Sequence, residues 1–352
     1  MATYSTEKGF TIQTIAGDPS PLLEGQVWYN TTSNTLKCYK AILGTGTWAS
    51  GGSLNTARQE PGGSGTQTAT LAFFGSAPGF FPSGATKAVE SYDGTSWTNT
   101  TYGNSERYGG GSIGQTSTDC AYAGGYGAPP PPLGKTFTEI WNGSTWTESG
   151  DLQTGRQSFQ GGAGTTAAGL VAGSGPADGA TETFNGTSWT EVNNLVTARQ
   201  YAPVCGLTST AAMCVGGYGI PSASPFSNGP GSRVGLTEIW DGLCWTNVSG
   251  TLNLGRIAAG LSGTSTDAVI SGGSVGDPAP PIPPPTATAE TWDGTSWTTV
   301  ASMADGNENP GSSSSSSTAA ISFGGWPGGS ITASEEWTVP ATTYGVKTFT
   351  SS

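Results

Sequence analysis

The sequence contains no histidine among its 352 residues. This absence excludes catalytic dyads and triads that use histidine as a base, and it excludes histidine-ligated zinc, iron or copper. Charged residues make up only 10% of the chain, with 12 cationic and 24 acidic side chains, and lysine and arginine do not cluster. We therefore expect no groove that neutralises nucleic-acid phosphates, and no nucleic-acid partner.

Cysteine and long apolar runs are also scarce. The five cysteines have no Cys-x-x-Cys spacing, which argues against thiolate metal sites, so we expect neither a metal nor a cofactor. Cys205 and Cys214 flank an expected strand turn and could pair across it, although two buried free thiols are favoured for a protein made in a reducing cytoplasm. The N-terminus lacks the features of a signal peptide, and no stretch approaches membrane-spanning length. We expect no export signal and no membrane insertion.

The residues that are abundant indicate a folded chain. Glycine (57) and proline (23) bring the composition close to that of disordered sequences. Twelve tryptophans, eleven tyrosines and eleven phenylalanines argue for a packed core, because disordered chains are poor in large apolar groups.

A repeated motif dominates the sequence. The pattern Glu-x-aromatic-[Asp/Asn]-Gly recurs at intervals of 43 to 56 residues, the range of four-stranded propeller blades. It starts at Glu90, Glu139, Glu182, Glu238 and Glu290, with a degenerate copy at Glu335-Glu336-Trp337. A tryptophan follows each complete motif, at Trp97, Trp146, Trp189, Trp245 and Trp297. An arginine recurs between the repeats, at Arg58, Arg107, Arg156, Arg199 and Arg256.

Each repeat predicts four strands and no helix. The [Asp/Asn]-Gly pair is a strong hairpin signal between the third and fourth strands. We therefore predict an all-β fold with six four-stranded blades over residues 48–352, while seven blades remain an alternative. The sixth repeat lacks the second tryptophan and the arginine, so its fourth strand is expected in GVKTFTSS at the C-terminus. Residues 1–47, with the hairpin GQVWYNTTSNTLKCYK and GTWAS as a third strand, are expected to form an attachment element.

These features resemble the kelch family of β-propellers. In that family a glycine pair ends the second strand, a Glu-x-Tyr-like element forms the third, and a tryptophan opens the fourth. The resemblance spans residues 48–340 and implies the kelch-type propeller fold. It departs from the pattern where the glycine pair becomes FFG in the first repeat and AGSG in the third.

The first 100 residues also look like virion proteins of tailed, particularly marine, bacteriophages. The matching segments are EGQVWYNTTSNTLK, LNTAR, GTQTATLAFFG and ESYDGTSWT. This resemblance implies a non-enzymatic virion protein, made in the host cytoplasm and docked to other virion proteins through its N-terminal segment. We expect a tail or fibre-associated adhesin that binds a host surface glycan or protein. A head or tail decoration protein is the alternative, followed by a cellular kelch scaffold.

The loops between second and third strands are the candidate binding site. They vary in length and are rich in proline and aromatic residues, whereas the turns between third and fourth strands are short. Loops on a rigid scaffold commonly carry binding function. The candidate residues are Phe80, Phe81, Tyr126, Tyr218, Phe226 and Trp326. An alternative is that these aromatic side chains fold back and cover the ends of the blades.

The repeated arginines, tryptophans and glutamates are interpreted as architectural. The tryptophans are expected to pack between neighbouring blades, and the arginines to stack on aromatic rings or bond strand-end carbonyls. One glutamate per blade places these carboxylates far apart around a ring, whereas a glycosidase needs two within about 5–10 Å. We therefore assign no catalytic residues.

Overall fold

The computed structural model divides the chain into two compact units. The first unit combines both ends of the chain, Met1–Thr45 and Val339–Ser352, and the second comprises Gly46–Thr338. The residues that the structure describes are 12–42, 45–77, 84–127, 134–174, 178–219, 233–275, 284–327, 331–340 and 343–349. Within these ranges no helix has the length and apolarity needed to cross a membrane.

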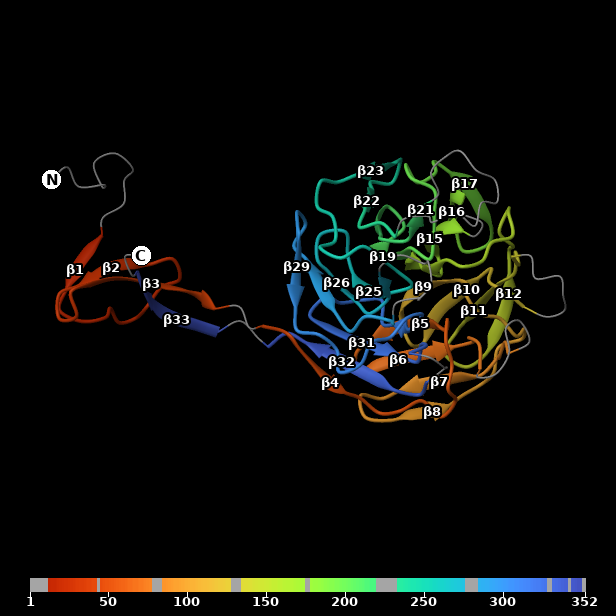
Figure 1. The fold of residues 1–352 in the computed structure, drawn as a ribbon, viewed down its shortest axis with the longest axis horizontal. Helices are drawn as coiled ribbons and strands as arrows, with labels where there is room; N and C mark the ends of the chain where they lie inside the picture. The colour runs from red at the N-terminus through yellow and green to blue at the C-terminus, as the bar shows by residue number, and fades with distance from the viewer. Residues whose placement is uncertain are drawn as a thin grey trace. The chain divides into compact units, whose positions relative to one another are not determined.

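The second unit is a ring of six four-stranded antiparallel sheets (Figure 1). The first strands of successive sheets contact one another in a closed cycle, in the order β5, β9, β14, β19, β25, β30 and back to β5. This cycle establishes six blades around one axis, as the repeats predict. The alternative of seven blades is thereby excluded.

The first three blades follow the chain order of their strands. They consist of β5 (Gly62–Thr66), β6 (Ala69–Phe73), β7 (Val89–Tyr92) and β8 (Trp97–Asn99); β9 (Gly111–Thr116), β10 (Asp119–Ala123), β11 (Thr138–Trp141) and β12 (Trp146–Ser149); and β14 (Ala163–Thr165), β15 (Ala168–Ser174), β16 (Asp178–Phe184) and β17 (Trp189–Val192).

The fourth and fifth blades have the same order and carry short additional strands. They consist of β19 (Pro203–Thr208), β20 (Ala211–Val215), β22 (Thr237–Trp240) and β23 (Trp245–Asn247), with β13 (Gln160–Gly161) parallel to β19; and β25 (Gly260–Gly263), β26 (Ala268–Ser271), β28 (Ala289–Trp292) and β29 (Trp297–Val300). Two short ribbons pair β18 (Arg199–Gln200) with β21 (Tyr218–Gly219), and β24 (Arg256–Ile257) with β27 (Ser274–Val275).

The sixth blade is closed by a strand from the other end of the unit. It contains β30 (Gly311–Ser312), β31 (Ala319–Phe323), β32 (Ser334–Thr338) and, as its fourth strand, β4 (Thr47–Ser50). Trp48 of β4 lies opposite Trp337, with the ring centroids 5.4 Å apart. The tryptophan missing from the sixth repeat is therefore supplied by GTWAS, and the expectation that GTWAS belongs to the attachment element is wrong.

The first unit is a separate four-stranded sheet. Its order is β1 (Gln13–Ile15), β2 (Val27–Asn30), β3 (Thr35–Ile42) and β33 (Thr343–Thr348). The expectation that GVKTFTSS is a blade strand is wrong, because β33 pairs antiparallel with β3 over six residue pairs. The propeller was expected to span residues 48–352. It spans Gly46–Thr338 instead, because residues 339–352 belong to the first unit.

Asp18 is an exposed carboxylate that joins several polar groups of the first unit. Its Oδ1 accepts hydrogen bonds from Trp28 Nε1 (3.1 Å), Asn30 Nδ2 (2.8 Å) and Lys37 Nζ (2.9 Å). These hydrogen bonds, with that of Lys37 the largest contribution, lower the pKa of Asp18. Trp28 is fully buried. The carboxylate of Asp18 therefore joins the segment before the hairpin to both of its strands, β2 and β3, and to a side chain of the core.

Tryptophans join neighbouring blades of the propeller. Trp189 is 1% exposed, and its Nε1 donates to Thr138 Oγ1 of the preceding blade at 2.8 Å. The same bond recurs from Trp245 to Thr181 and from Trp297 to Thr237, each at 2.9 Å. The second tryptophan of a repeat therefore packs at the interface between blades, and in these three repeats its N–H group has a polar partner.

Turn chemistry explains the hairpins between third and fourth strands. Asn142 Oδ1 accepts hydrogen bonds from the backbone N–H groups of Ser144 (3.0 Å) and Thr145 (2.9 Å), while Gly143 takes a φ of 92°. An Asn or Asp side chain can cap a turn in this way, and glycine adopts the left-handed conformation without strain.

The closure by β4 predicts where the chain can be cut. A variant containing only residues 46–338 should unfold cooperatively, because every blade keeps its four strands. Removal of residues up to Ser50 should destabilise it further by at least about 3 kcal/mol, because the buried Trp337 loses Trp48 and β32 loses its partner. Chemical denaturation monitored by tryptophan fluorescence measures the free energy of unfolding of the two variants. Equal stability of the two variants would show that β4 does not close the ring.

Candidate functional site

A buried ion pair recurs in five of the six blades. In each, an arginine that precedes the first strand contacts the glutamate of the third strand, and both side chains are at most 1% exposed. The pairs are Arg58–Glu90, Arg107–Glu139 (2.9 Å), Arg156–Glu182 (2.5 Å), Arg199–Glu238 (3.0 Å) and Arg256–Glu290 (2.6 Å). The repeated glutamates, which had no partner in the sequence interpretation, are thus held by the repeated arginines.

The second blade illustrates what each ion pair holds in place. Arg107 Nη1 donates to the carbonyl oxygens of Gly124 (3.2 Å) and Phe137 (2.7 Å), at the two ends of the loop between second and third strands. Glu139 Oε2 accepts from the backbone N–H of Asn104 (2.8 Å), in the connection from the preceding blade. Burial lowers the pKa of Arg107, and the negative charge of Glu139 opposes this effect. One ion pair therefore fixes both ends of a loop and the chain that enters the blade.

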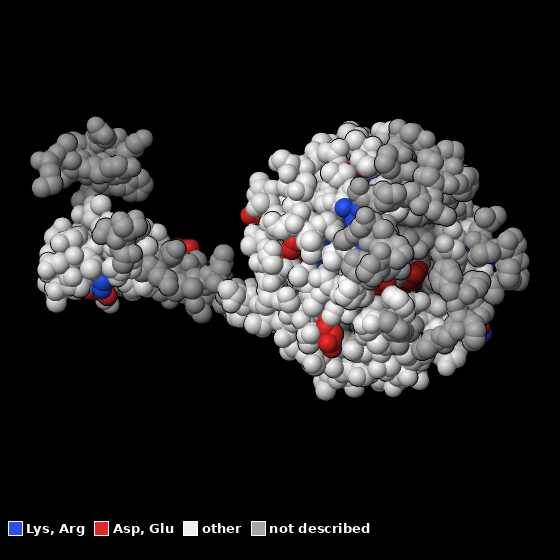
Figure 2. Space-filling model, viewed as in Figure 1, with Lys and Arg blue, Asp and Glu red and all other residues white. Residues whose placement is uncertain are grey.

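These bonds define one side of the propeller, which we call the loop-bearing face. It comprises the loops between second and third strands and the connections that precede first strands. Isolated β-bridges join the loop of one blade to the arginine segment of the next blade along the ring. Examples are the bridges of Thr86 with Arg107 and of Lys135 with Arg156. Among the described residues on the side that Figure 2 shows, the propeller carries few charged atoms, and most of them are acidic.

Six equivalent residues surround the axis at this face. They lie two positions after the arginine of each blade, or after Asn307 in the sixth, and those that are not glycine have φ between 51° and 56°. We call them the axial ring: Glu60, Gly109, Ser158, Tyr201, Ala258 and Asn309. Backbone hydrogen bonds of 2.7–3.2 Å connect neighbouring members of the ring. From Ser158 onward, the N–H of each residue donates to the carbonyl oxygen of the residue before it, through Tyr201, Ala258, Asn309 and Glu60 to Gly109.

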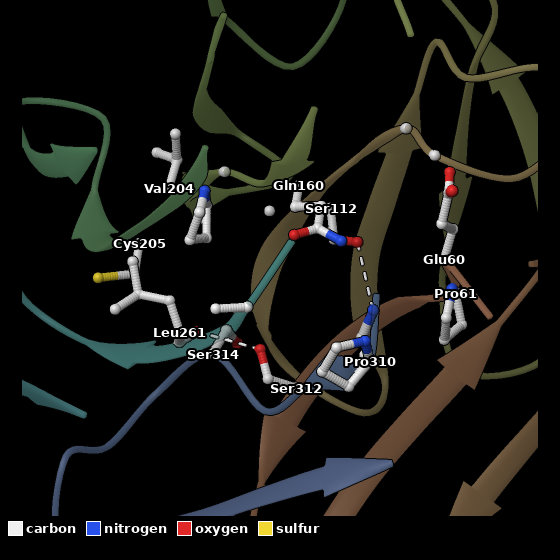
Figure 3. Close-up of a pocket in the computed structure, with 18 residues that line it drawn as sticks. Glu60, Pro61, Ser112, Gln160, Val204, Cys205, Leu261, Pro310, Ser312 and Ser314 are labelled. Atoms are coloured by element: carbon white, nitrogen blue, oxygen red, sulfur yellow. Dashed lines mark hydrogen bonds between the residues drawn. The ribbon is translucent and has the colours of Figure 1, made fainter. Parts of the chain in front are cut away.

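A small cavity lies on the axis behind this ring (Figure 3). Its volume is about 40 Å³, room for only a few water molecules or an ion. Gln160 extends across it in Figure 3, and Glu60 lies at one edge. Gln115 Nε2 donates to the carbonyl oxygens of Gly164 (3.0 Å) and Gly206 (3.1 Å), so a side chain also crosses between inner strands of different blades. This cavity, as the described residues line it, is too small for a larger ligand.

Glu60 is the unusual member of the axial ring. Its side chain is buried, and Oε2 has no hydrogen-bond partner among the described residues. Burial, together with the charge of Glu308, raises the pKa of Glu60 to about 7. Burial also raises the pKa of Tyr126 and of Tyr201, and Glu60 contributes to both shifts. A carboxylic acid and several phenols therefore form a polar cluster at the centre of the loop-bearing face.

Three of the six predicted binding residues can be placed. Tyr126, Tyr218 and Trp326 occupy the same position after the glycine pair, in the second, fourth and sixth blades. They lie around the axis with one blade between each, so the structure does not bring them into one aromatic patch. Phe80, Phe81 and Phe226 lie outside the described residues.

The packing of these three residues differs. The ring of Tyr126 stacks on Tyr108 at 5.0 Å, and its hydroxyl accepts a hydrogen bond from Ser158 at 3.4 Å. Tyr126 thus covers the end of its blade, as the alternative interpretation of the aromatic residues expects. Tyr218 is half-buried in β21, whereas Trp326 is 37% exposed. Trp326 is the one of the three best exposed to contact a partner.

The cysteines form no disulfide in the structure. Cys214 shares a cluster with Val204 and Trp240, whereas Cys205 packs with Met213 and Leu261 on the other side of the fourth blade. Their side chains point to opposite faces of one sheet, which excludes the pairing considered from the sequence. The described residues also contain no group of three or more acidic or cysteine side chains that could hold a metal ion.

Comparisons with known proteins agree with this architecture. No protein-family model matches the sequence, and no curated protein matches it. The solved structure of YjhT, a kelch-repeat β-propeller protein, matches with a TM-score of 0.65. The chain has the kelch-type β-propeller fold. The match covers 84% of this chain and 99% of YjhT at 13% sequence identity, a level at which the fold alone is shared.

The ion pair leads to a prediction for stability. Arg156→Met should destabilise the protein by about 3–5 kcal/mol, because Glu182 would remain buried without its cation. The double variant Arg156→Met, Glu182→Met should recover part of this loss. Urea denaturation measures the three proteins, with the exposed Glu148→Gln as a control expected to change stability by less than about 0.5 kcal/mol. A double variant less stable than Arg156→Met would contradict this account.

Glu60 leads to a prediction for pH dependence. Its pKa is raised from 4.5 to about 7 in the folded protein, so its ionisation opposes folding increasingly as pH rises between these values. Glu60→Gln should remove this penalty and stabilise the protein at pH 8 by on the order of 3 kcal/mol relative to wild type, with little difference at pH 4. Denaturation midpoints of the two proteins from pH 4 to pH 8 measure this difference in stability. Parallel curves for the two proteins would show that Glu60 ionises freely.

Proposed function

We propose that the protein is a non-enzymatic recognition protein whose loop-bearing face binds a partner. The observation that carries this proposal is the repeated ion pair, which anchors the ends of loops whose sequences differ from blade to blade. A uniform scaffold with variable loops suits recognition, because the scaffold limits the entropy lost when the loops bind. Ser, Thr, Asn and aromatic side chains, which are abundant in this chain, suit both sugars and protein surfaces.

We further propose that the first unit docks the protein to a phage particle. This unit is unlike the repeated blades, and it carries both ends of the chain. Four of the six lysines belong to it, at Lys8, Lys37, Lys40 and Lys347, whereas the propeller is strongly acidic. The phage assignment itself rests on the sequence resemblance of the first 100 residues.

The target that we propose is a host surface glycan or protein, and the protein would act as an adhesin. A decoration protein that binds other virion subunits through the propeller is the alternative. The two differ in what the loop-bearing face contacts, so they can be separated experimentally.

Cell binding tests the adhesin. Replacement of the loop between Gly217 and Gly235 by a short turn should reduce binding of the purified protein to intact host cells at least tenfold. Leu243→Ser is the matched control, because Leu243 is 75% exposed in a turn between third and fourth strands. Competition with envelope polysaccharide distinguishes a glycan from a protein receptor. Binding unchanged by the loop replacement would contradict adhesion through this loop.

Particle incorporation tests the docking role separately. The variant that contains only residues 46–338 should fold and bind cells but fail to enter particles. If it still enters particles, docking lies on the propeller, and the decoration alternative is favoured.

A further inference from the structure

The sixth blade keeps the repeated glutamate and lacks its arginine. Glu335 lies in β32 directly opposite Ser322, as Glu139 lies opposite Tyr122 in the second blade. Asn307 stands in place of the arginine, and its Nδ2 donates to the carbonyl oxygen of Gly324 at 2.6 Å. The carbonyl that Asn307 bonds corresponds to that of Gly124, which Arg107 bonds in the second blade.

The shorter asparagine leaves most of the guanidinium contacts unmade. Glu335 Oε2 accepts from the backbone N–H of Ala304 at 2.8 Å, as the other glutamates accept from the equivalent connection. Glu335 Oε1, which would receive Nη2 of an arginine, has no hydrogen bond among the described residues. Among the described residues, the carbonyl oxygen of Ala333, equivalent to that of Phe137, receives only the backbone N–H of Gly324.

Two further oxygen atoms at this place lack partners. Asn307 Oδ1 and Ser322 Oγ are buried, and neither has a hydrogen-bond partner within the described ranges. Residue Asn307 is 8% exposed and Ser322 is 3% exposed. The position of Ser322 faces the guanidinium in the second blade, where the ring of Tyr122 lies 5.2 Å from Arg107. Other blades place Ala72, Val171, Cys214 and Ile270 at this position, and the hydroxyl of Tyr122 accepts from Gly110, so an unpartnered hydroxyl at this position is found, among the described residues, in the blade without arginine.

A cleft of about 410 Å³ is lined by the residues that carry these oxygen atoms. We call it the sixth-blade cleft, and its lining includes Asn307, Ser322, Ala333, Glu335, Pro285 and Met303. Asp305 adds a second carboxylate to the lining. The cleft therefore combines buried oxygen acceptors and negative charge with an apolar wall.

We propose that the sixth-blade cleft binds a guanidinium group supplied from outside the chain. A guanidinium presents five N–H donors in a plane and no acceptor, which matches a set of acceptors that includes a carboxylate, an amide oxygen, a hydroxyl and a carbonyl. Its charge would pair with Glu335 as the internal arginines pair with their glutamates. The proline and methionine wall suits the methylene stem of an arginine side chain. This inference holds whether or not the loops of this face bind a host surface.

Binding of methylguanidinium to the full-length protein tests the site. Isothermal titration calorimetry should show one saturable site for methylguanidinium and at least tenfold weaker binding of methylammonium, which lacks the planar fork. Asn307→Arg places a guanidinium in the site from within the chain. This variant should lose methylguanidinium binding while its thermal midpoint stays equal to or above that of wild type.

Two carboxylate variants complete the test. Glu335→Gln should weaken methylguanidinium binding at least tenfold, whereas the exposed Glu148→Gln, which removes the same charge from another blade, should leave it unchanged. The proposal is overturned if wild type shows no saturable binding, if folded Asn307→Arg binds as tightly as wild type, or if calcium binds this site and methylguanidinium does not.

The source of the group is distinguished by two arginine compounds. Free L-arginine and N-acetyl-arginine methylamide carry the same guanidinium, but only the second mimics arginine within a polypeptide. Tight binding of the capped compound alone supports an arginine of a partner protein, and equal binding of both supports a free small molecule. Failure of both to bind would overturn the proposal together with the methylguanidinium result.

Discussion

The buried arginine–glutamate pair is the interaction on which the propeller depends. A charged pair away from water is favourable only when its remaining donors and acceptors are also satisfied. In the fifth blade Arg256 donates to Glu290, to two loop-end carbonyls and, through Nε, to the carbonyl oxygen of Leu254, and Glu290 also accepts from the incoming chain. Each pair thereby joins three segments that are distant in sequence. This explains how a chain with only 10% charged residues uses five of its six arginines in the interior.

The repeats were sufficient to predict the blades but not every strand in them. The Glu-x-aromatic and [Asp/Asn]-Gly signals are local, because they report a strand and the hairpin that follows it. The closure of the sixth blade by β4 is not local, since Trp48 and Trp337 lie at opposite ends of the propeller sequence. The tryptophan missing from the sixth repeat was the available signal, and GTWAS is the segment that contains a spare tryptophan next to the first repeat.

The candidate site shows the same limit. The recurrent arginine and the motif glutamate are each recognisable in the sequence, but 26 to 39 residues separate the partners, so spacing alone does not reveal the pair. Glu60 gave no signal at all, because its burial arises only when six connections meet around the axis. The aromatic loop residues were recognised by composition, yet their packing depends on tertiary neighbours. Tyr126 stacks on Tyr108 while Trp326, at the equivalent position, remains partly exposed.

Two positions at which a blade departs from the repeat differ in the polar groups that remain without a partner. At the blade interfaces, Thr138, Thr181 and Thr237 accept a tryptophan N–H, whereas Val89 and Ala289 stand at the equivalent position in two other blades. The loss of a threonine there leaves one unpaired donor within an aromatic interface that still packs. In the sixth blade the loss of the arginine leaves a carboxylate in place and comes with an additional hydroxyl, Ser322, facing the same space. Glu335 is half-buried and keeps its hydrogen bond from Ala304, so its carboxylate remains in a blade that supplies no cation for it. The acceptors that are kept therefore indicate a site for a donor that the chain itself does not supply.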